Sequence, residues 1–101
     1  MSSIDAILAI SVAAKLLDLH PRTIMLYERT GLMKPFRTGT QRRMYSAKDL
    51  DDLQFIKFLT RQKGINLQGV KLVLEAISLA EKGGVDLKGQ LFSNFKAEKL
   101  F

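Results

Sequence analysis

The sequence has no cysteine, no tryptophan and a single histidine. Without cysteine there can be no disulfide framework, no thiolate metal site and no cysteine nucleophile. Long apolar runs are also missing: the longest, residues 6–14, is interrupted by Ser11, whereas a membrane span needs about 20 residues. The first ten residues carry only Asp5 as a charge, unlike a secretory signal. These absences predict a cytoplasmic protein with no membrane crossing, no metal and no cofactor.

The positive charge is concentrated in one part of the chain. The 101 residues are 47% hydrophobic and 26% charged, which suits one packed domain. Residues 20–48 hold seven basic residues and one acid, Glu28, giving a net charge of +6, while the other 72 residues hold nine bases and nine acids. Such an excess predicts a single anion-binding surface, which scattered solvated lysines would not produce.

The first third of the chain predicts two short helices. Residues 1–9 have no helical pattern, and we expect an arm that is loose or packed on a partner. Ser11 is the expected N-cap of a helix ending at Leu17. Pro21 suits the first position of a second helix, which ends before Gly31 because glycine favours a left-handed cap. Two short helices joined by a three-residue turn are typical of a helix-turn-helix.

The second helix has two different faces. Ile24 and Tyr27 lie three apart and are expected to pack inward. The other face carries two arginines and two apolar side chains, Arg22, Met25, Leu26 and Arg29. Arginine can bond phosphate or guanine, and an apolar side chain can pack on a thymine methyl, so this face suits a major groove. Alternatively, Met25 and Leu26 belong to the core.

Residues 32–45 cannot form one helix, because they include Pro35 and Gly39. Two short strands, residues 32–37 and 42–45, around a turn at 38–40 predict a wing. Three arginines would lie near its tip, Arg37, Arg42 and Arg43. Their long side chains could reach phosphates, or alternatively bind a carboxylate or a small phosphorylated ligand.

Ser46 is the expected N-cap of a third helix that runs to about Gln62 and supplies most of the core. Three acids at its beginning, Asp49, Asp51 and Asp52, suit the positive end of a helix dipole. They are less well explained as a metal site, because no histidine or second acidic cluster accompanies them.

Asn66 is expected to cap a fourth helix that continues to about Lys82. Arg61 and Lys63, just before it, would add two positive charges beside free backbone N–H groups, a combination that holds phosphate. This arrangement would form a second, helical wing.

The C-terminal third presents unpaired apolar strips. Leu72 and Leu79 lie seven apart on the fourth helix, away from its core face. Beyond a glycine pair, residues 86–99 predict a short amphipathic helix with an apolar edge formed by Leu87, Leu91, Phe92 and Phe95. Free surfaces of this kind associate, most simply with a second copy.

Three stretches carry a family resemblance: ISVAAKLLDLHPRTIMLYERTGLMKP, RTGTQRRMYSAKDLDDLQFIKFL and KGINLQGVKLVLE. Their most specific parts are HPRT, YERTGL and the wing exit at Arg43, Tyr45 and Ser46. Over residues 10–75 the chain resembles the DNA-binding domain of the MerR family of bacterial transcription regulators, particularly its heat-shock-repressor-like branch.

The resemblance implies a winged helix-turn-helix. Together with the elements argued above from the residues, the expected fold is mainly α, with a short two-stranded wing and a C-terminal amphipathic helix. The expected organisation is a DNA-binding domain over residues 10–82, an arm before it, and a short dimerisation or partner helix over 83–101. The DNA-binding positions carried over are Arg22, Leu26, Tyr27 and Arg29 on the recognition helix, Arg43 and Tyr45 on the wing, and Arg61 on the helical wing. With the residues argued above, and Ser11 at the start of the first helix, these make up the predicted DNA-contacting set. Family members usually have arginine at the position of Met25 and often at that of Met44.

We therefore expect a regulator that binds an inverted repeat in double-stranded DNA as a homodimer and represses the promoter or distorts it for activation. RNA polymerase or another protein is an additional expected partner. The alternative, favoured by Met25 and Met44, is an excisionase-like architectural or protein-interaction module with weak or no independent DNA binding. No enzyme is expected, because nothing sets a nucleophile beside a base with an orienting group.

Overall fold

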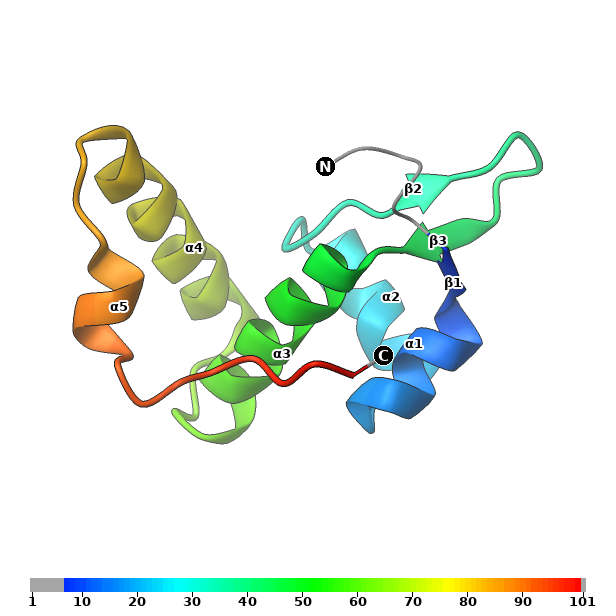
Figure 1. Cartoon of the computed structure of the whole chain (residues 1–101), viewed down its shortest axis with the longest axis horizontal. Coiled ribbons are helices and arrows are strands. Elements are labelled where there is room, and N and C mark those ends of the chain that lie inside the picture. Colours follow the sequence, from blue (N-terminus) through cyan, green and yellow to red (C-terminus); the bar gives the residue numbers. More distant parts are fainter. Residues whose placement is uncertain (1–6, 101) are drawn as a thin grey trace.

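The computed structural model describes residues 7–100, which form five helices and a small three-stranded sheet (Figure 1). In chain order the elements are β1 (Leu8–Ala9), α1 (Ile10–Leu17), α2 (Pro21–Arg29), β2 (Phe36–Arg37), β3 (Arg43–Tyr45), α3 (Ala47–Arg61), α4 (Leu67–Lys82) and α5 (Leu87–Leu91). The predicted fold class, a mainly α winged helix-turn-helix, is confirmed.

The helix-turn-helix forms as predicted, with different caps. Helix α1 begins two residues early, with Ala9 in the N-cap position and no side-chain cap, so Ser11 lies exposed in its first turn instead of capping it. The reason is that the chain passes directly from β1 into the helix. His20 caps α2, because its Nδ1 accepts a hydrogen bond from the Arg22 N–H at 3.0 Å. Pro21 occupies the first helical position, where a missing N–H costs nothing.

The sheet has three strands in the order β1-β3-β2, one more than the predicted two-stranded wing. Leu8, expected in a loose arm, pairs with Tyr45, and the Ile7 N–H donates to the Tyr45 carbonyl at 3.1 Å. Residues 1–6 of the predicted arm lie outside the described residues. Strand β2 is shorter than expected and begins only after Pro35, which has no N–H to donate to a ladder.

Helix α3 is central to the core. Ser46 and Asp49 form a capping box at its start, each side chain accepting from the other residue's backbone N–H. The apolar faces of α1, α2 and α4 pack around α3. The fully buried side chains of this core include Ile24, Tyr45, Leu50, Leu53, Ile56, Leu59 and Val70. The Lys57 ammonium donates to the Leu17 carbonyl at 2.8 Å and so ties α3 to the end of α1.

The C-terminal third differs from the prediction of one helix over residues 86–99. Helix α5 ends at Leu91, and residues 92–100 run along α3 towards α1 (Figure 1). The rings of Phe92 and Phe95 turn back against α3, so the chain leaves the helical path. Helix α4 has the predicted bounds, and its cap is confirmed, since Asn66 accepts from the Gly69 N–H at 2.8 Å.

Candidate nucleic-acid interface

Helix α2 presents an exposed polar face from a firmly held position. Ile24 is fully buried and Tyr27 is 3% exposed, so the inner face is anchored in the core. Arg22 and Arg29 are exposed, and Leu26 retains 39% of its surface. The predicted set is therefore divided, because Tyr27 packs inward and its side chain is not presented on the surface. Met25 is half-buried and lies between the two environments.

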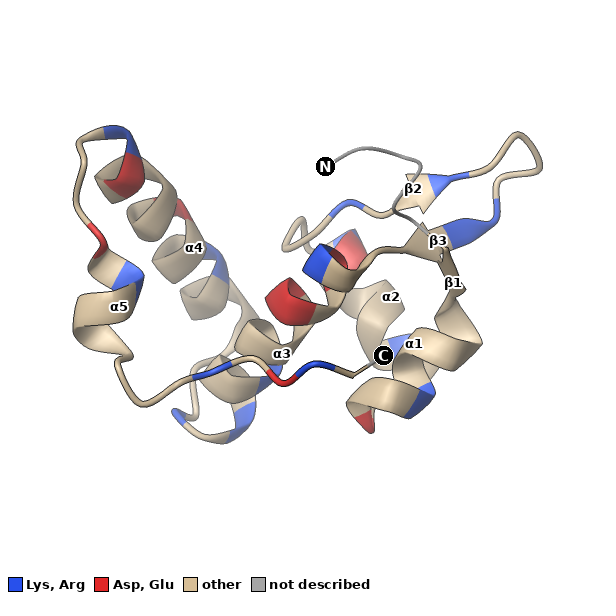
Figure 2. Cartoon of the chain, in the orientation of Figure 1, with Lys and Arg blue, Asp and Glu red and all other residues tan. Residues whose placement is uncertain are grey.

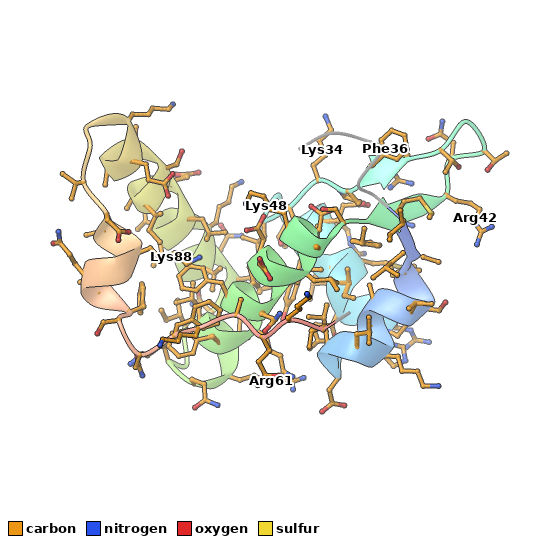
Figure 3. All side chains as sticks on the ribbon, viewed as in Figure 1. Lys34, Phe36, Arg42, Lys48, Arg61 and Lys88 are labelled. Carbon is orange, nitrogen blue, oxygen red and sulfur yellow. The ribbon has the colours of Figure 1, made fainter. Side chains whose placement is uncertain are left out.

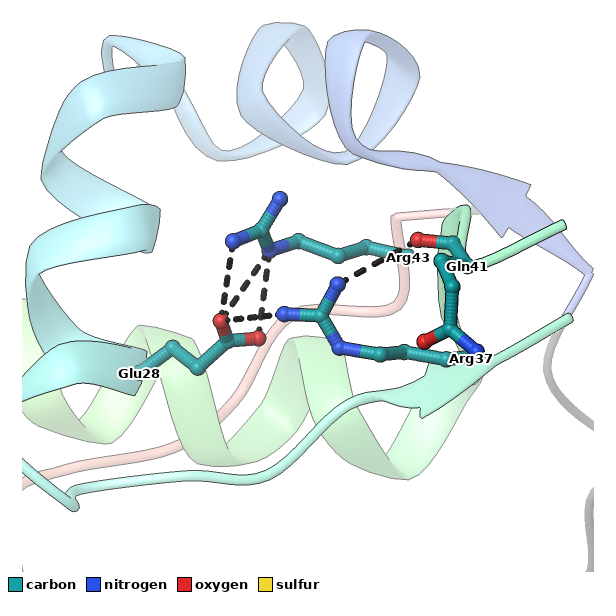
Figure 4. Close-up of polar contacts among 4 residues, drawn as sticks. All are labelled: Glu28, Arg37, Gln41 and Arg43. Atoms are coloured by element: carbon teal, nitrogen blue, oxygen red, sulfur yellow. Dashed lines mark hydrogen bonds and ion pairs between the residues drawn. The ribbon is translucent and has the colours of Figure 1, made fainter.

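The wing is joined to α2 by an ion-pair cluster centred on Glu28. In the sheet, Arg37 and Arg43 are paired residues of β2 and β3 and so lie on one face. Arg37 Nη2 donates to Glu28 Oε1 at 2.8 Å. Arg43 donates to both carboxylate oxygens, through Nε at 3.1 Å to each and through Nη2 at 3.0 Å to Oε1 (Figure 4). Two of the predicted DNA-binding arginines thus share one carboxylate.

The cluster affects how Glu28 ionises. Partial burial is the largest single influence and opposes ionisation, but the hydrogen bonds and charges of Arg43 and Arg37 together outweigh it. The pKa of Glu28 is consequently lowered from the ordinary glutamate value. The carboxylate is therefore charged at neutral pH and offsets one of the two arginine charges.

The wing turn carries an arginine that is free of this cluster. Thr38 and Gln41 close the turn with a backbone hydrogen bond of 2.8 Å, and Gln41 has a left-handed φ of 65°. Arg37 Nη1 also donates to the Gln41 carbonyl at 3.2 Å. Arg42 projects from this end of the molecule (Figure 3) and has no ion-pair partner within residues 7–100. Its guanidinium is available to a phosphate.

Tyr45, predicted as a wing contact, lies in the core with none of its surface exposed. Its hydroxyl has no hydrogen-bond partner among the described residues. Burial raises the pKa of Tyr45 to about 12, with the Glu28 charge acting in the same direction and the charges of Arg43 and Arg37 opposing it. The side chain therefore packs in the core beneath β3 and does not form part of the wing surface.

The helical wing lies at the junction of α3 and α4. Arg61 is the last residue of α3, and Lys63 follows in the loop before the N-terminus of α4. Both side chains are exposed, and Arg61 points to the lower edge of the molecule in Figure 3. The Lys63 ammonium also lies 5.7 Å from the centroid of the Phe58 ring. These are the two cations predicted for a phosphate site.

The basic residues of the central segment are spread over α2, the wing, the loop before the wing and the start of α3 (Figure 2). Lys48 pairs with Asp52 at 3.1 Å, and Lys34 points to the edge of the molecule opposite to Arg61 (Figure 3). Because Glu28 holds Arg37 and Arg43, four of the seven cations are exposed without an ion pair in residues 7–100: Arg22, Arg29, Lys34 and Arg42.

The predicted partner residues fall into two groups. Three of them are open to solvent: Leu72 and Leu79 on α4 are 67% and 68% exposed, and Leu91 is 60% exposed. The other three, Leu87, Phe92 and Phe95, are partly buried against the core of the same chain. The rings of Phe92 and Phe95 lie 5.0–6.0 Å from those of Phe55 and Phe58, measured between centroids.

Sequence reasoning missed the role of Glu28, although the signal was present. Glu28 is the one acid among the seven bases of residues 20–48, and a lone carboxylate among arginines favours a paired, oriented role. The contact of Lys57 with Leu17 had no comparable signal, because it joins residues 40 positions apart.

None of the helices within residues 7–100 has the length and hydropathy of a membrane span. In the same residues, no cluster of three or more His, Cys, Asp or Glu side chains is placed to hold a metal ion.

Comparison with known proteins agrees with this geometry. The model of the MerR HTH family regulatory proteins matches residues 8–77. A putative heat shock protein HspR of Streptomyces coelicolor is 47% identical over 66 residues, which cover 65% of this chain and 44% of that protein. The HTH-type transcriptional regulator GlnR of Bacillus anthracis is 42% identical over 65 residues, covering 64% of this chain and 50% of GlnR. The matched part of the chain thus spans half or less of the length of these relatives.

Proposed function

This chain belongs to the MerR family of helix-turn-helix regulatory proteins, within its HspR-like branch, and we propose that it regulates transcription by sequence-specific binding to double-stranded DNA. The observation that carries the proposal is the two-sided recognition helix. Ile24 and Tyr27 fix α2 in the core, while Arg22 and Arg29 are exposed on it. A helix held in this way can enter a major groove as a rigid unit, with arginines for guanine edges and phosphates.

Five exposed cations have a role in this proposal. Arg22 and Arg29, beside Leu26, read base edges and adjoining phosphates from α2. Arg42 reaches a phosphate from the wing turn. Arg61 and Lys63 hold a second phosphate near the N-terminus of α4, where free N–H groups favour an anion.

The protein is proposed to act as a homodimer on an inverted repeat. Residues 10–82 form the DNA-binding domain, and residues 83–101, together with the exposed Leu72 and Leu79, join two copies. In such a dimer the two recognition helices contact half-sites separated by about one turn of DNA. Binding would then repress the promoter or distort it so that RNA polymerase can use it. Neither role requires catalysis.

A protein-interaction module with weak DNA binding is the second candidate. It is favoured by Met25 and Met44, which supply no charge to the interface, and by the large exposure of Leu72, Leu79 and Leu91. An excisionase-like factor of this kind would form a stable hetero-complex and show little affinity for DNA by itself.

Selection of bound duplexes from a random pool tests the two candidates directly. We expect an enriched sequence with inverted-repeat symmetry, and a log affinity that falls with log salt by about 0.9 for each phosphate contact. Sedimentation of the same protein with the selected duplex gives the stoichiometry. Absence of binding even at low ionic strength would reject the regulator and favour the interaction module.

A further inference from the structure

The Glu28 carboxylate is the polar link between the recognition helix and the wing. Within residues 7–100, the hydrogen bonds that join β2 or β3 to α2 all end on this side chain. The wing strands have only two and three residues. Such a short hairpin has few backbone bonds of its own to hold its direction relative to α2.

The two arginines contact Glu28 differently. Arg43, with its side chain 26% exposed, donates from two nitrogens to both oxygens of the carboxylate. Arg37, at 37% exposure, donates one bond to Glu28 and another to the carbonyl of Gln41 in the wing turn. Arg43 therefore anchors β3 to α2, while Arg37 extends the same contact to the turn that carries Arg42 (Figure 4).

We propose that Glu28 is a positioning residue, which holds the exposed arginine of the wing turn at a fixed place relative to the recognition helix. This inference rests on the proposed DNA-binding function and names what sets its specificity. A flexible wing would still attract phosphates, because attraction by exposed cations needs no fixed geometry. A fixed wing instead sets the register of α2 on the duplex, and that register determines which bases Arg22 and Arg29 meet.

If Glu28 acted only through its charge, its removal would have the opposite effect on DNA binding. Removing a carboxylate from a basic surface raises the net charge by one and so favours every duplex. Positioning predicts instead that binding to the selected sequence weakens while binding to random DNA is kept or strengthened. The low pKa of Glu28 means that this contrast applies at neutral pH, where the carboxylate is charged.

The experiment compares Glu28→Gln with the wild type and with Glu81→Gln as a matched control. Glu81 is exposed near the end of α4 and has no ion-pair partner within residues 7–100, so its change alters the charge equally. We expect Glu28→Gln to reduce the ratio of affinities for selected and random duplexes by about tenfold, and Glu81→Gln to leave the ratio unchanged. An unchanged or increased ratio in Glu28→Gln would overturn the proposal.

Arg37→Lys provides a second test if Glu28→Gln fails to fold, as judged by circular dichroism. Lysine keeps the charge but cannot span Glu28 and Gln41 with two directed N–H groups. The same loss of the affinity ratio is expected, with the net charge unchanged.

A measurement without DNA separates this inference from the proposed function. The chain has no cysteine, so spin labels at Thr40→Cys and Lys15→Cys report the distance from the wing turn to α1. We expect a narrow distribution in the otherwise unchanged protein and a broad one after Glu28→Gln. Equal distance distributions in the two proteins would overturn the positioning role of Glu28. If the distribution broadens after Glu28→Gln but the wild type binds no DNA, the proposed function alone is rejected.

Discussion

The side-chain amide of Gln54 on α3 binds both backbone polar groups of Glu98. Gln54 Nε2 donates to the Glu98 carbonyl at 2.9 Å, and Gln54 Oε1 accepts from the Glu98 N–H at 2.8 Å. An extended segment has no helical partners for these groups, so a side-chain amide that matches both of them fixes its place. Together with Phe92 and Phe95, this contact keeps residues 92–100 along α3.

We expect Gln54→Ala to release this segment without unfolding the domain. Each hydrogen bond contributes about 0.5–1.5 kcal/mol to stability, so the loss of both should lower the free energy of unfolding by roughly 1–3 kcal/mol. Hydrogen exchange should accelerate at Glu98 and its neighbours, while the α3 amides stay protected. Gln68→Ala, at an exposed glutamine in the first turn of α4, is the control. Unchanged exchange at Glu98 would contradict this interpretation.

The raised pKa of Tyr45 predicts that the folded protein loses stability at alkaline pH. Its pKa is raised to about 12 in the folded protein, against about 10 in an unfolded chain. Because the pKa is higher in the folded state, the contribution of neutral Tyr45 to the free energy of unfolding is complete below pH 10 and is lost as the pH rises from 10 to 12. The loss should approach roughly 2–3 kcal/mol. Denaturant unfolding measured across this interval should decline more steeply in the wild type than in Tyr45→Phe.

The same substitution tests whether the Tyr45 hydroxyl reaches DNA. The hydroxyl is buried without a hydrogen-bond partner in residues 7–100, and an unsatisfied buried polar group costs about 1–3 kcal/mol. At neutral pH, Tyr45→Phe should therefore be as stable as the wild type or more stable, and it should bind the selected duplex equally well. A clear loss of affinity in a fully folded variant would show that the ring leaves the core to contact phosphate.

Local signals in the sequence were sufficient for most of the fold. Pro21, Ser46 with Asp49, and Asn66 act through neighbours within three residues, and each begins a helix in the structure as expected. The third strand was not predictable in the same way, because Leu8 has no strand pattern of its own and becomes ordered only by pairing with Tyr45.

In the candidate site, too, the features set by neighbouring residues were predictable, whereas those set by distant residues were not. Exposure of Arg22 and Arg29 follows from helical periodicity. A lone acid among seven bases signals that Glu28 is paired, but the identity of its partners, Arg37 and Arg43, depends on where the hairpin folds back onto α2. The helix expected over residues 86–99 is shortened for a similar reason: the apolar spacing of Phe92 and Phe95 fits a helix, but their rings find a better site against Phe55 and Phe58.

Arg22 and Arg61 should respond differently to alanine substitution. Arg22 lies in the first turn of α2, where a bidentate contact to guanine contributes about 1–3 kcal/mol of discrimination. Arg22→Ala should therefore lower the affinity for the selected duplex more than that for random DNA. Arg61→Ala should weaken both equally and reduce the salt slope by about 1. Titrations at several salt concentrations with both duplexes check this assignment, and equal effects of the two variants would contradict it.

The exposed leucines of α4 should determine the oligomeric state. Leu72 and Leu79 are about two-thirds exposed, so replacing both with aspartate should leave the fold of the monomer unchanged. In a dimer each leucine would bury apolar surface worth about 1.5–3 kcal/mol, and Leu72→Asp with Leu79→Asp should weaken self-association at least about 100-fold. Phe36→Asp, which changes an exposed apolar side chain on the wing, far from α4 in Figure 1, is the matched control. Sedimentation velocity should show a monomer for the double variant and a dimer for the control. Because a monomer occupies one half-site, the double variant should bind the inverted repeat more weakly than the wild type but bind a single half-site equally well. A double variant that remains dimeric would show that a different face joins the subunits.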